Sequence, residues 1–309
     1  MQDGIDFSKL RTHSIRERKS LVKVADFAAL PGPGASCDEL IASLPEILAG
    51  AWFRELVAKL RGVVDGGGDI VLAMGAHVIK CGLSPVVIDL INRGIVTAVA
   101  TNGAGAIHDY EIALIGQTSE DVEEELSAGR FGMARETAAA LAQAALAARR
   151  DGGGLGETLG AMIVRDDLPY AKHSVLAACV RAGIPATVHV AVGADVVHMH
   201  PGADGADIGA ASLADFRTIS GVVKGLAGGA WLNVGSAVLL PEVFLKAVAV
   251  ARNLGADLDS MVTANFDMYD LYRPRTNVVK RPSGNGYQII GRHEIMLPLL
   301  RMALISPRG

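Results

Sequence analysis

The chain has 309 residues, of which 50% are hydrophobic and 20% are charged, and its formal net charge is −4. This composition is typical of a globular α/β protein with a large core and excludes a disordered or fibrous chain. The mildly acidic balance excludes a basic nucleic-acid footprint, and no apolar run reaches the roughly 18–20 residues that a membrane span needs. Three scattered cysteines without CxxC spacing and a polar N-terminus predict a cytoplasmic protein without disulfides.

The predicted elements begin after a polar N-terminal arm, residues 1–35, and residues 36–309 are predicted to form a single α/β domain. Ser36 and Glu39 have the spacing of a capping box and predict a helix that reaches about Leu48. A second helix is predicted over 52–60, followed by a buried strand over 70–74. Ser84-Pro85 predicts the start of the next helix, with Ser84 as its N-cap. A strand over 95–100 follows, and then helices over 105–115, 119–127, 132–149 and 155–164.

The second half of the sequence continues the same alternation. Helices are predicted over 171–182, 212–226, 241–254 and 294–305, and strands over 186–192, 230–234, 261–264 and 287–290. Repeated strand–helix alternation predicts an open, doubly wound, mainly parallel sheet with helices on both faces. The carboxyl ends of parallel strands share one edge, where such folds bind ligands.

Glycine, hydroxyl and amide residues follow several of the predicted strands. Small residues allow a ligand to approach the backbone, and free N–H groups suit a phosphate, so we expect these strand ends to form a nucleotide crevice. The alternative is that Gly and Asn simply end strands. No GxGxxG or Walker A pattern is present, so the ordinary Rossmann and P-loop readings have no support. The candidate cofactor-binding residues are Gly75, Thr101, Asn102, Gly103, Gly235, Ser236 and Thr263.

Histidines near the crevice are the candidate bases. His108 follows the second predicted strand, and His198 and His200 lie in a segment, 189–207, that holds three His and three Asp. We favour loop histidines that contact substrate, with Asp195 as a further substrate residue. One alternative is a metal site built on His189, His198 and His200, since two His at spacing two would share one face of a strand. The other is that these are plain structural polar residues. No HExxH motif or Cys pair accompanies them.

The segment 267–282 holds two Asp, two Tyr, three Arg and a Lys. Asp267, Arg273 and Arg275 are candidates for binding an anionic substrate, and the segment could also order as a lid. The alternative is a solvated loop between strands. Lys280 is the candidate nucleophile, because a desolvated lysine with a lowered pKa can form an imine.

The stretch 101–116 resembles a deoxyhypusine synthase motif in which a strand ends in Thr-x-Gly-Ala and a His-Asp pair follows. Segments 82–96, 235–245 and 262–264 are similar to further segments of that family, in the same order, over roughly residues 70–305. The resemblance implies an open α/β fold, NAD bound at the carboxyl edge, and a homo-oligomer (dimer or tetramer) with sites at dimer interfaces. It also implies NAD contacts from Thr101, Gly103, Ala104, Gly235, Thr263 and Ala264, with Asp109 near the ribose.

The chain departs from that family where the polyamine binds. The family's His-His pair is Pro241-Glu242 here, and its catalytic lysine falls opposite Val279, beside Lys280. We therefore expect an NAD-dependent enzyme, an oxidoreductase or a transferase, that acts by lasting or transient oxidation of a small, non-polyamine substrate. One alternative is a metal-dependent hydrolase or lyase that uses the histidine cluster. The other is a non-catalytic nucleotide-binding protein.

Overall fold

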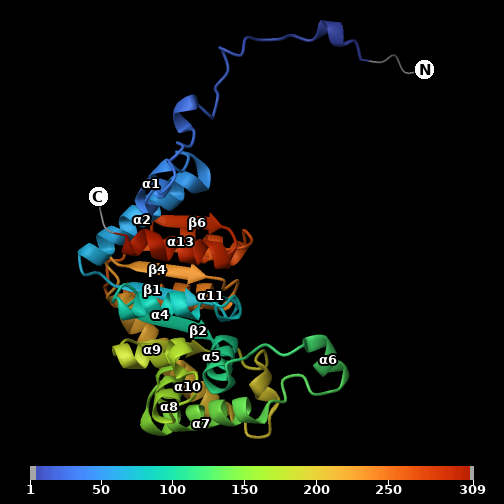
Figure 1. The fold of residues 1–309 in the computed structure, drawn as a ribbon, viewed down its shortest axis with the longest axis vertical. Coiled ribbons are helices and arrows are strands. Elements are labelled where there is room, and N and C mark those ends of the chain that lie inside the picture. The colour runs from blue at the N-terminus through green and yellow to red at the C-terminus, as the bar shows by residue number, and fades with distance from the viewer. Residues whose placement is uncertain (1–4, 307–309) are drawn as a thin grey trace.

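A six-stranded parallel sheet forms the centre of the computed structural model, which describes residues 5–306 (Figure 1). Four of the strands are buried along their whole length, as expected when helices cover both faces of a parallel sheet. The doubly wound parallel sheet predicted from the sequence is confirmed. The strands are β1 (Ile70–Met74), β2 (Ala98–Asn102), β3 (Ala186–His189), β4 (Ala230–Val234), β5 (Val262–Asp267) and β6 (Gly286–Ile290).

The strand order β3-β2-β1-β4-β5-β6 contains one reversal of direction. The chain builds β2 and β3 on one side of β1 and then crosses to the other side to build β4, β5 and β6. This is the order of dinucleotide-binding folds, in which the ligand crevice lies outside the carboxyl ends of the two strands at the reversal. Those strands are β1 and β4, and we call the place where they end the switch point.

Helices pack on both faces of the sheet (Figure 1). One face is covered by α2 (Leu48–Asp65), α4 (Ser84–Asn92), α9 (Val175–Ala182) and α13 (His293–Ile305), and the other by α10 (Gly205–Lys224), α11 (Leu239–Asn253) and the π-helix η5 (Arg275–Lys280). Beyond β3, α7 (Arg135–Asp151) and α8 (Leu155–Arg165) enlarge the first core. The remaining elements are η1 (Phe7–Lys9), η2 (Val24–Asp26), α1 (Cys37–Ser43), α3 (His77–Lys80), α5 (Gly103–Ile115), α6 (Val122–Ser127), η3 (Ala171–His173), η4 (Val196–Met199) and α12 (Tyr272–Pro274).

Most predicted elements are present, but several of their ends differ. Helix α10 begins at Gly205 rather than at 212, because the Asp204 side chain accepts hydrogen bonds from the first N–H groups of this helix. The helix predicted over 171–182 is interrupted at Ser174, whose extended backbone and hydroxyl cap α9. Ser84 lies inside α4, one residue after the N-cap Leu83. Segment 267–282 is mostly helical rather than a loop. No helix within residues 5–306 is long and apolar enough to cross a membrane.

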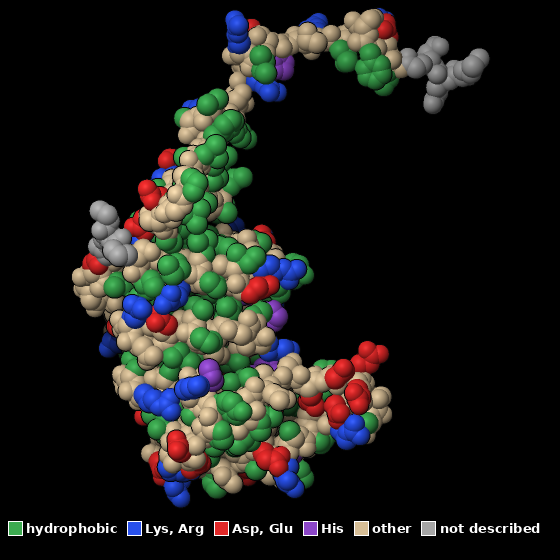
Figure 2. All heavy atoms as spheres, viewed as in Figure 1, with side chains coloured by type: hydrophobic (Ala, Val, Ile, Leu, Met, Phe, Trp, Pro, Cys, Tyr) green, Lys and Arg blue, Asp and Glu red, His purple; other side chains and the backbone are tan. Residues whose placement is uncertain are grey.

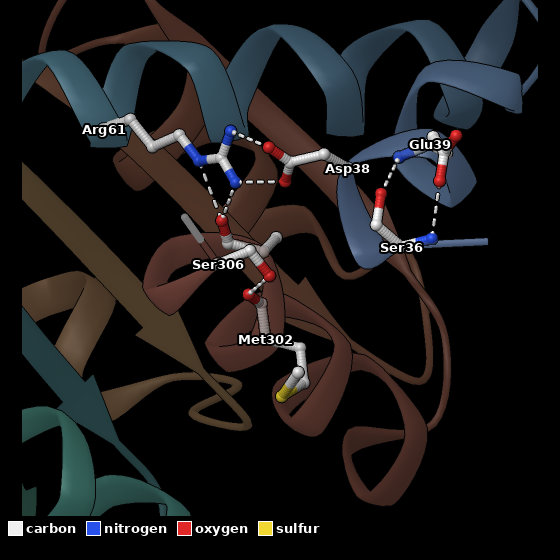
Figure 3. A network of polar contacts seen from close by, with 7 residues as sticks. Ser36, Asp38, Glu39, Arg61, Met302 and Ser306 are labelled. Carbon is white, nitrogen blue, oxygen red and sulfur yellow. Dashed lines mark hydrogen bonds and ion pairs between the residues drawn. The ribbon is translucent and has the colours of Figure 1, made fainter. Parts of the chain in front are cut away.

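A half-buried ion pair fastens α1 to the body (Figure 3). Arg61 on α2 donates from Nη2 and Nη1 to the two Asp38 oxygens at 2.5 and 3.2 Å, and from Nε to the Ala303 carbonyl of α13 at 2.8 Å. The side chains of Arg61 and Asp38 are only 19% and 28% exposed. The predicted capping box is confirmed, since the N–H groups of Ser36 and Glu39 each donate to the other's side chain at 2.7 and 3.2 Å. Three helices are therefore joined at one place.

Replacing Arg61 with Ala removes the guanidinium from Asp38 and from the Ala303 carbonyl. We expect the free energy of unfolding in urea to fall by about 2–3 kcal/mol, because a partly buried charge loses its donors. The control is Arg150→Ala, whose 75% exposed side chain pairs with the adjacent Asp151 and should change stability by less than about 0.5 kcal/mol. Equal, small effects for both variants would contradict the structural role of Arg61.

Candidate functional site

Two histidines lie at the switch point. His77 begins α3 directly after β1, is exposed, and packs edge-on against the ring of His293, with 5.8 Å between centroids. His293 is buried, and its Nε2 lies 3.2 Å from the Phe266 carbonyl, so this nitrogen donates. Its Nδ1 is then an acceptor, and it has no partner within residues 5–306. A buried acceptor without a donor marks a place where a ligand donor or a water can bind.

Two cations without carboxylate partners lie beside these histidines. Burial and then the Glu294 carboxylate raise the pKa of Cys81, while the charges of Arg292 and Lys80 act to lower it. Both charges act on Cys81, and the Glu294 carboxylate lies at the same thiol, with 3.8 Å between Oε2 and Sγ. Within the described chain neither forms a salt bridge, and Arg292 Nη1 contacts only a thioether, that of Met268, at 3.0 Å. Unpaired cations at the carboxyl edge suit a phosphate group.

A cavity of about 460 Å³ opens next to the switch point, on the side of β2 and β3. We call it the side cavity. Lys80 lines it and so joins it to the switch point, and its walls come from α5, the segment 116–134 and the loop 194–197. Its volume is that of a small-molecule site. Its apolar lining includes Ile107, Ile115, Val122, Phe131, Val196 and Val197, and its polar lining includes Lys80, His108, Glu111, Gln117, Thr118, Ser119, Glu120, Thr137 and Asp195.

A hydrogen-bonded relay lies in the wall of the side cavity. Thr118 Oγ1 donates its one hydrogen to Glu111 Oε2 at 2.5 Å, so it must accept from His108 Nδ1, which lies at 2.6 Å. Nδ1 therefore carries a proton, and in the neutral ring Nε2 is the basic nitrogen. Thr137 donates to Glu111 Oε1 at 3.1 Å. The relay thus fixes the tautomer of His108.

Glu111 is suited to hold a positive charge on His108. Burial acts to raise the pKa of Glu111, but the hydrogen bonds from His108, Thr118 and Thr137 together lower it below its ordinary value. The ionised carboxylate lies 3.8 Å from His108 Nδ1. A carboxylate that orients an imidazole and stabilises its protonated form is the arrangement that supports general-base chemistry.

The N-terminus of α5 is already capped, contrary to the expectation that its N–H groups are free for a phosphate. Asn102 Oδ1 accepts from the Gly105 N–H at 2.8 Å, and the Asp195 carboxylate lies beside Ala104, with its Oδ2 buried and without a hydrogen-bond partner among residues 5–306. A Cβ on Gly103 would lie 2.0 Å from Asp195 Oδ2. Asp195 therefore occupies the space beside Gly103 and Ala104, and a ligand could contact them only if this side chain moved.

Asp109 does not lie at the surface of the crevice. Its carboxylate is buried and accepts from Ser174 Oγ at 2.5 Å and from the N–H groups of Val175 and Leu176 at 2.7 and 3.1 Å. The implied position of Asp109 near a ribose is therefore wrong, because both oxygens cap helix α9. Burial nevertheless raises the pKa of Asp109 to about 6, against the lowering effect of these donors.

The side chains of three further candidate cofactor residues are buried in the sheet and the core rather than exposed at the crevice. The Thr101 hydroxyl donates to the Met74 carbonyl at 2.9 Å, inside the sheet. Ala264 is fully buried in the core under α2 and α13, so a cofactor contact from its side chain is excluded by its place in β5. Thr263 points to the opposite face and is also fully buried, with an unpartnered hydroxyl. Of the predicted set, Gly75, Gly235 and Ser236 lie at the switch point itself.

The histidines of segment 189–200 do not converge. His189 is buried at the end of β3, where burial lowers its pKa to about 4 and its Nε2 lies 3.0 Å from Thr187 Oγ1. His198 Nδ1 accepts from a backbone N–H of its own loop, and His200 Nε2 lies 2.9 Å from the Gly132 carbonyl. The segment 196–199 is the 3-10 helix η4 rather than a strand, so spacing two does not place two rings on one face. No group of three His, Cys, Asp or Glu in residues 5–306 is placed to hold a metal.

Lys280 lies at the opposite edge of the sheet from the switch point. The connection from β5 to β6 leaves the carboxyl edge and must return to the amino edge, where β6 begins at Gly286. Lys280 is exposed near the end of this return, and Arg252 at the end of α11 donates to the nearby Pro282 carbonyl at 2.7 Å. Within one chain, Lys280 therefore cannot act on a substrate held at the carboxyl edge, which corrects its predicted role as nucleophile.

The three predicted anion-binding residues lie near the carboxyl edge but outside the side cavity. Asp267 is buried and accepts from the two backbone N–H groups that follow it. Arg273 pairs with Glu242 at 3.2 Å, and Arg275 pairs with Asp270 at 2.7 Å. Their binding of a substrate stays a prediction, and it would require these pairs to break.

Sequence reasoning missed five residues of the site: Lys80, Glu111, Thr118, Thr137 and Arg292. Glu111 lies one helical turn after His108, so helical spacing could have indicated it. The other four come from separate elements, and no local pattern connects them. The cation that lines the side cavity is thus Lys80, not one of the arginines of segment 267–282.

Comparisons with known proteins show a shared fold. No protein-family model matches the sequence, and no curated protein matches it. A conserved LOR/SDH protein from Methanococcus maripaludis aligns over 84% of this chain and 70% of its own, with 17% identity and a TM-score of 0.54. ArgZ, an arginine dihydrolase from cyanobacteria, aligns over 84% of this chain with 18% identity and a TM-score of 0.51, and this chain spans only 33% of its length.

A protein described as a deoxyhypusine synthase, from Entamoeba histolytica, also aligns, over 87% of this chain and 93% of its own. Its identity is 12% and its TM-score is 0.49. At these identities, the similarities concern the fold alone.

Stability should depend on pH through a second buried carboxylate, Asp215. It accepts from the N–H groups of Gly156 and Val188 at 3.1 and 2.9 Å, and burial raises its pKa to about 7. The folded state then binds more protons than the unfolded state between about pH 4 and pH 7. The contribution of Asp215 to the free energy of unfolding should therefore be largest below pH 4 and fall as the pH rises to 7, by at most about 4 kcal/mol.

The variant Asp215→Asn keeps an oxygen for the two N–H groups but cannot titrate. We expect it to flatten the decrease in unfolding free energy over this pH range, measured by urea denaturation at a series of pH values. Asp151→Asn, at the exposed end of α7, controls for the loss of a carboxylate elsewhere. If the two variants and the parent protein follow parallel curves, the contribution assigned to Asp215 is refuted.

Proposed function

We propose that this chain is an NAD-dependent enzyme that oxidises a small molecule held in the side cavity. The observation that carries the proposal is that the switch point and the side cavity are adjacent. A switch point of dinucleotide-binding type, with two unpaired cations, lies directly beside a cavity whose wall holds the His108–Thr118–Glu111 relay. Cofactor and substrate would thus meet at one edge of the sheet.

The residues of the switch point fit a pyrophosphate better than the N-terminus of α5 does. Lys80 and Arg292 would hold its charge, whereas at α5 Asn102 already accepts from the Gly105 N–H and the Asp195 carboxylate fills the space beside Gly103. Ala76 and Gly235 leave the backbone accessible, and His293 Nδ1 offers a buried acceptor. Bound NAD would supply the hydride acceptor.

The chain's own residues would provide the general base and the apolar surroundings of the reacting carbon. His108 Nε2 would take the proton from a substrate O–H or N–H group while the adjacent C–H bond is oxidised. Glu111 would stabilise the imidazolium that forms, and Thr118 would keep the ring in place. The apolar lining contributed by Ile107 and Phe131 would exclude water around the reacting carbon.

NAD⁺ binding tests the cofactor assignment. At about 100-fold excess over Kd, NAD⁺ should stabilise the protein by about 2.7 kcal/mol and so raise the melting temperature by several degrees. Lys80→Gln should weaken binding at least about tenfold in calorimetry, because a charge-assisted phosphate contact is lost.

Lys224→Gln is the matched control, because Lys224 is exposed at the end of α10, on the amino-edge side of the sheet. It should bind NAD⁺ as the parent protein does. An unchanged melting temperature with millimolar NAD⁺ or NADP⁺ would refute the cofactor assignment, and equal losses in both variants would refute the placement of the pyrophosphate.

Turnover tests the role of His108. In a screen of alcohols, amines, hydroxy acids and amino acids with NAD⁺, read as NADH absorbance, His108→Ala should reduce kcat by about 10²- to 10⁴-fold and leave NAD⁺ affinity unchanged. Glu111→Gln should reduce kcat less than His108→Ala does, since the imidazolium loses its carboxylate but the base remains. Bound NAD⁺ with no turnover for any substrate would favour a non-catalytic nucleotide-binding protein.

A further inference from the structure

The N-terminal arm carries large apolar side chains that are exposed in the single chain. The arm extends away from the body beyond α1 (Figure 1), and its base is fastened by the Ala29 N–H to the Ser43 carbonyl at 2.9 Å. The hydrogen bonds of residues 5–25 stay within the arm. Nine of its large apolar residues are between 55% and 95% exposed: Ile5, Phe7, Leu10, Ile15, Leu21, Val22, Val24, Phe27 and Leu30.

A row of apolar side chains without a packing partner is costly to leave in water. The arm is also basic, since residues 5–30 contain six Lys or Arg against three Asp or Glu, in a chain whose net charge is −4. Its complement should therefore be a surface that is both apolar and acidic.

The segment 116–134 provides such a surface. It projects from the body around α6 and contains five acidic residues against one basic residue. Helix α6 has no buried residue. Figure 2 shows the acidic side chains gathered on this projection, at the lower right of the view. The carboxylates of Glu123 and Glu124 have no cation partner within residues 5–306, although Arg130 pairs with Glu125 at 2.8 Å.

Exposed apolar residues lie on and beside the same projection. Val122 and Leu126, one turn apart on α6, are 49% and 63% exposed, and Ile115 and Met133 at the two ends of the projection are 58% and 47% exposed. Val122 and Ile115 also line the side cavity, so this surface is continuous with the opening of that cavity. We call residues 115–134 the acidic projection.

We propose that the N-terminal arm of one copy of this chain docks on the acidic projection of a second copy. The two surfaces are complementary in charge, and both leave apolar side chains exposed in the single chain. The arm leaves the body at the end of the molecule opposite α6, so it reaches away from its own projection (Figure 1). Because each copy carries both surfaces, the exchange can be reciprocal around a two-fold axis and form a closed dimer.

Charge reversal tests the pairing. Sedimentation velocity over a range of concentrations should show a dimer for the parent protein. Arg16→Glu with Arg18→Glu in the arm, or Glu123→Arg with Glu124→Arg in the projection, should each weaken the dimer at least tenfold. Combining all four changes should restore much of the affinity, because opposite charges again face each other. A monomeric parent protein, or a dimer that neither reversal weakens, would overturn the proposal.

Disulfide trapping distinguishes a second copy from the same chain. One chain carries Ser20→Cys in the arm, and a chain of different tag length carries Glu124→Cys in the projection. We expect a mixed dimer on oxidation, visible on a non-reducing gel. Glu157→Cys, exposed on α8, replaces Glu124→Cys as the control and should give little product. Bridging only within a chain that carries both Ser20→Cys and Glu124→Cys, with no mixed dimer, would refute docking between copies.

These results are independent of the proposed enzyme activity. The assays report association only, so docking can fail while NAD⁺ binding succeeds, and the reverse also holds. All the substituted positions are exposed. Unchanged circular dichroism and melting temperature in each variant would confirm that the fold is intact.

Discussion

The backbones of β1 and β4 meet at Gly75 and Gly235, and the arrangement of the carboxyl edge depends on this contact. The Gly75 N–H donates to the Val234 carbonyl at 2.9 Å, and the Gly235 N–H donates to Phe266 at 3.0 Å, so both strand ends stay in the sheet. A Cβ on Gly75 would lie 2.2 Å from the Gly235 carbonyl oxygen, a distance that no side chain tolerates. The contact therefore allows α3 and α13 to begin side by side, which brings His77 against His293.

Helix α5 is the rigid wall of the site. Asn102 caps its N-terminus, Asp195 fills the space beside Gly103, and Asp109 in its second turn caps helix α9. The buried Asp109 carboxylate joins α5 to α9, so the side chains of His108 and Glu111 have a defined position. The facing wall, segment 116–134, is held by fewer contacts, such as Glu120 to the Gly132 N–H at 2.9 Å. The relay joins the two walls, because His108 and Glu111 come from α5 and Thr118 comes from segment 116–134.

The position of Lys280 agrees with the departures from the deoxyhypusine synthase pattern. That resemblance covers the strand ends, which lie together at the carboxyl edge of the sheet. It fails over segment 267–282, which runs from the carboxyl edge to the amino edge. The polar groups left beside the crevice are Lys80, Arg292 and the His108 relay. A fold that occurs in enzymes of several kinds does not determine the substrate. Substrate specificity depends on side chains such as these.

The sequence by itself determined the class of fold. Apolar β-branched runs such as 70–74 and 95–100 can bury both faces of a strand, and the helices between them leave parallel pairing as the natural outcome. Local chemistry also determined the Ser36–Glu39 capping box and the cap at Asn102, because their partners lie within three residues. The convergence of the strand ends followed from parallel pairing alone.

Only the tertiary structure decided which polar side chains are free to act. Asp and His are residue types that active sites use. Asp109, however, accepts hydrogen bonds from the start of α9, and His189 is buried at the end of β3. Lys80 and Thr118 have no distinguishing local pattern, yet they line the side cavity beside His108. The reason is physical. Spacing along the chain predicts contacts within a helix or strand, whereas burial, capping and pairing between distant segments depend on how whole elements pack.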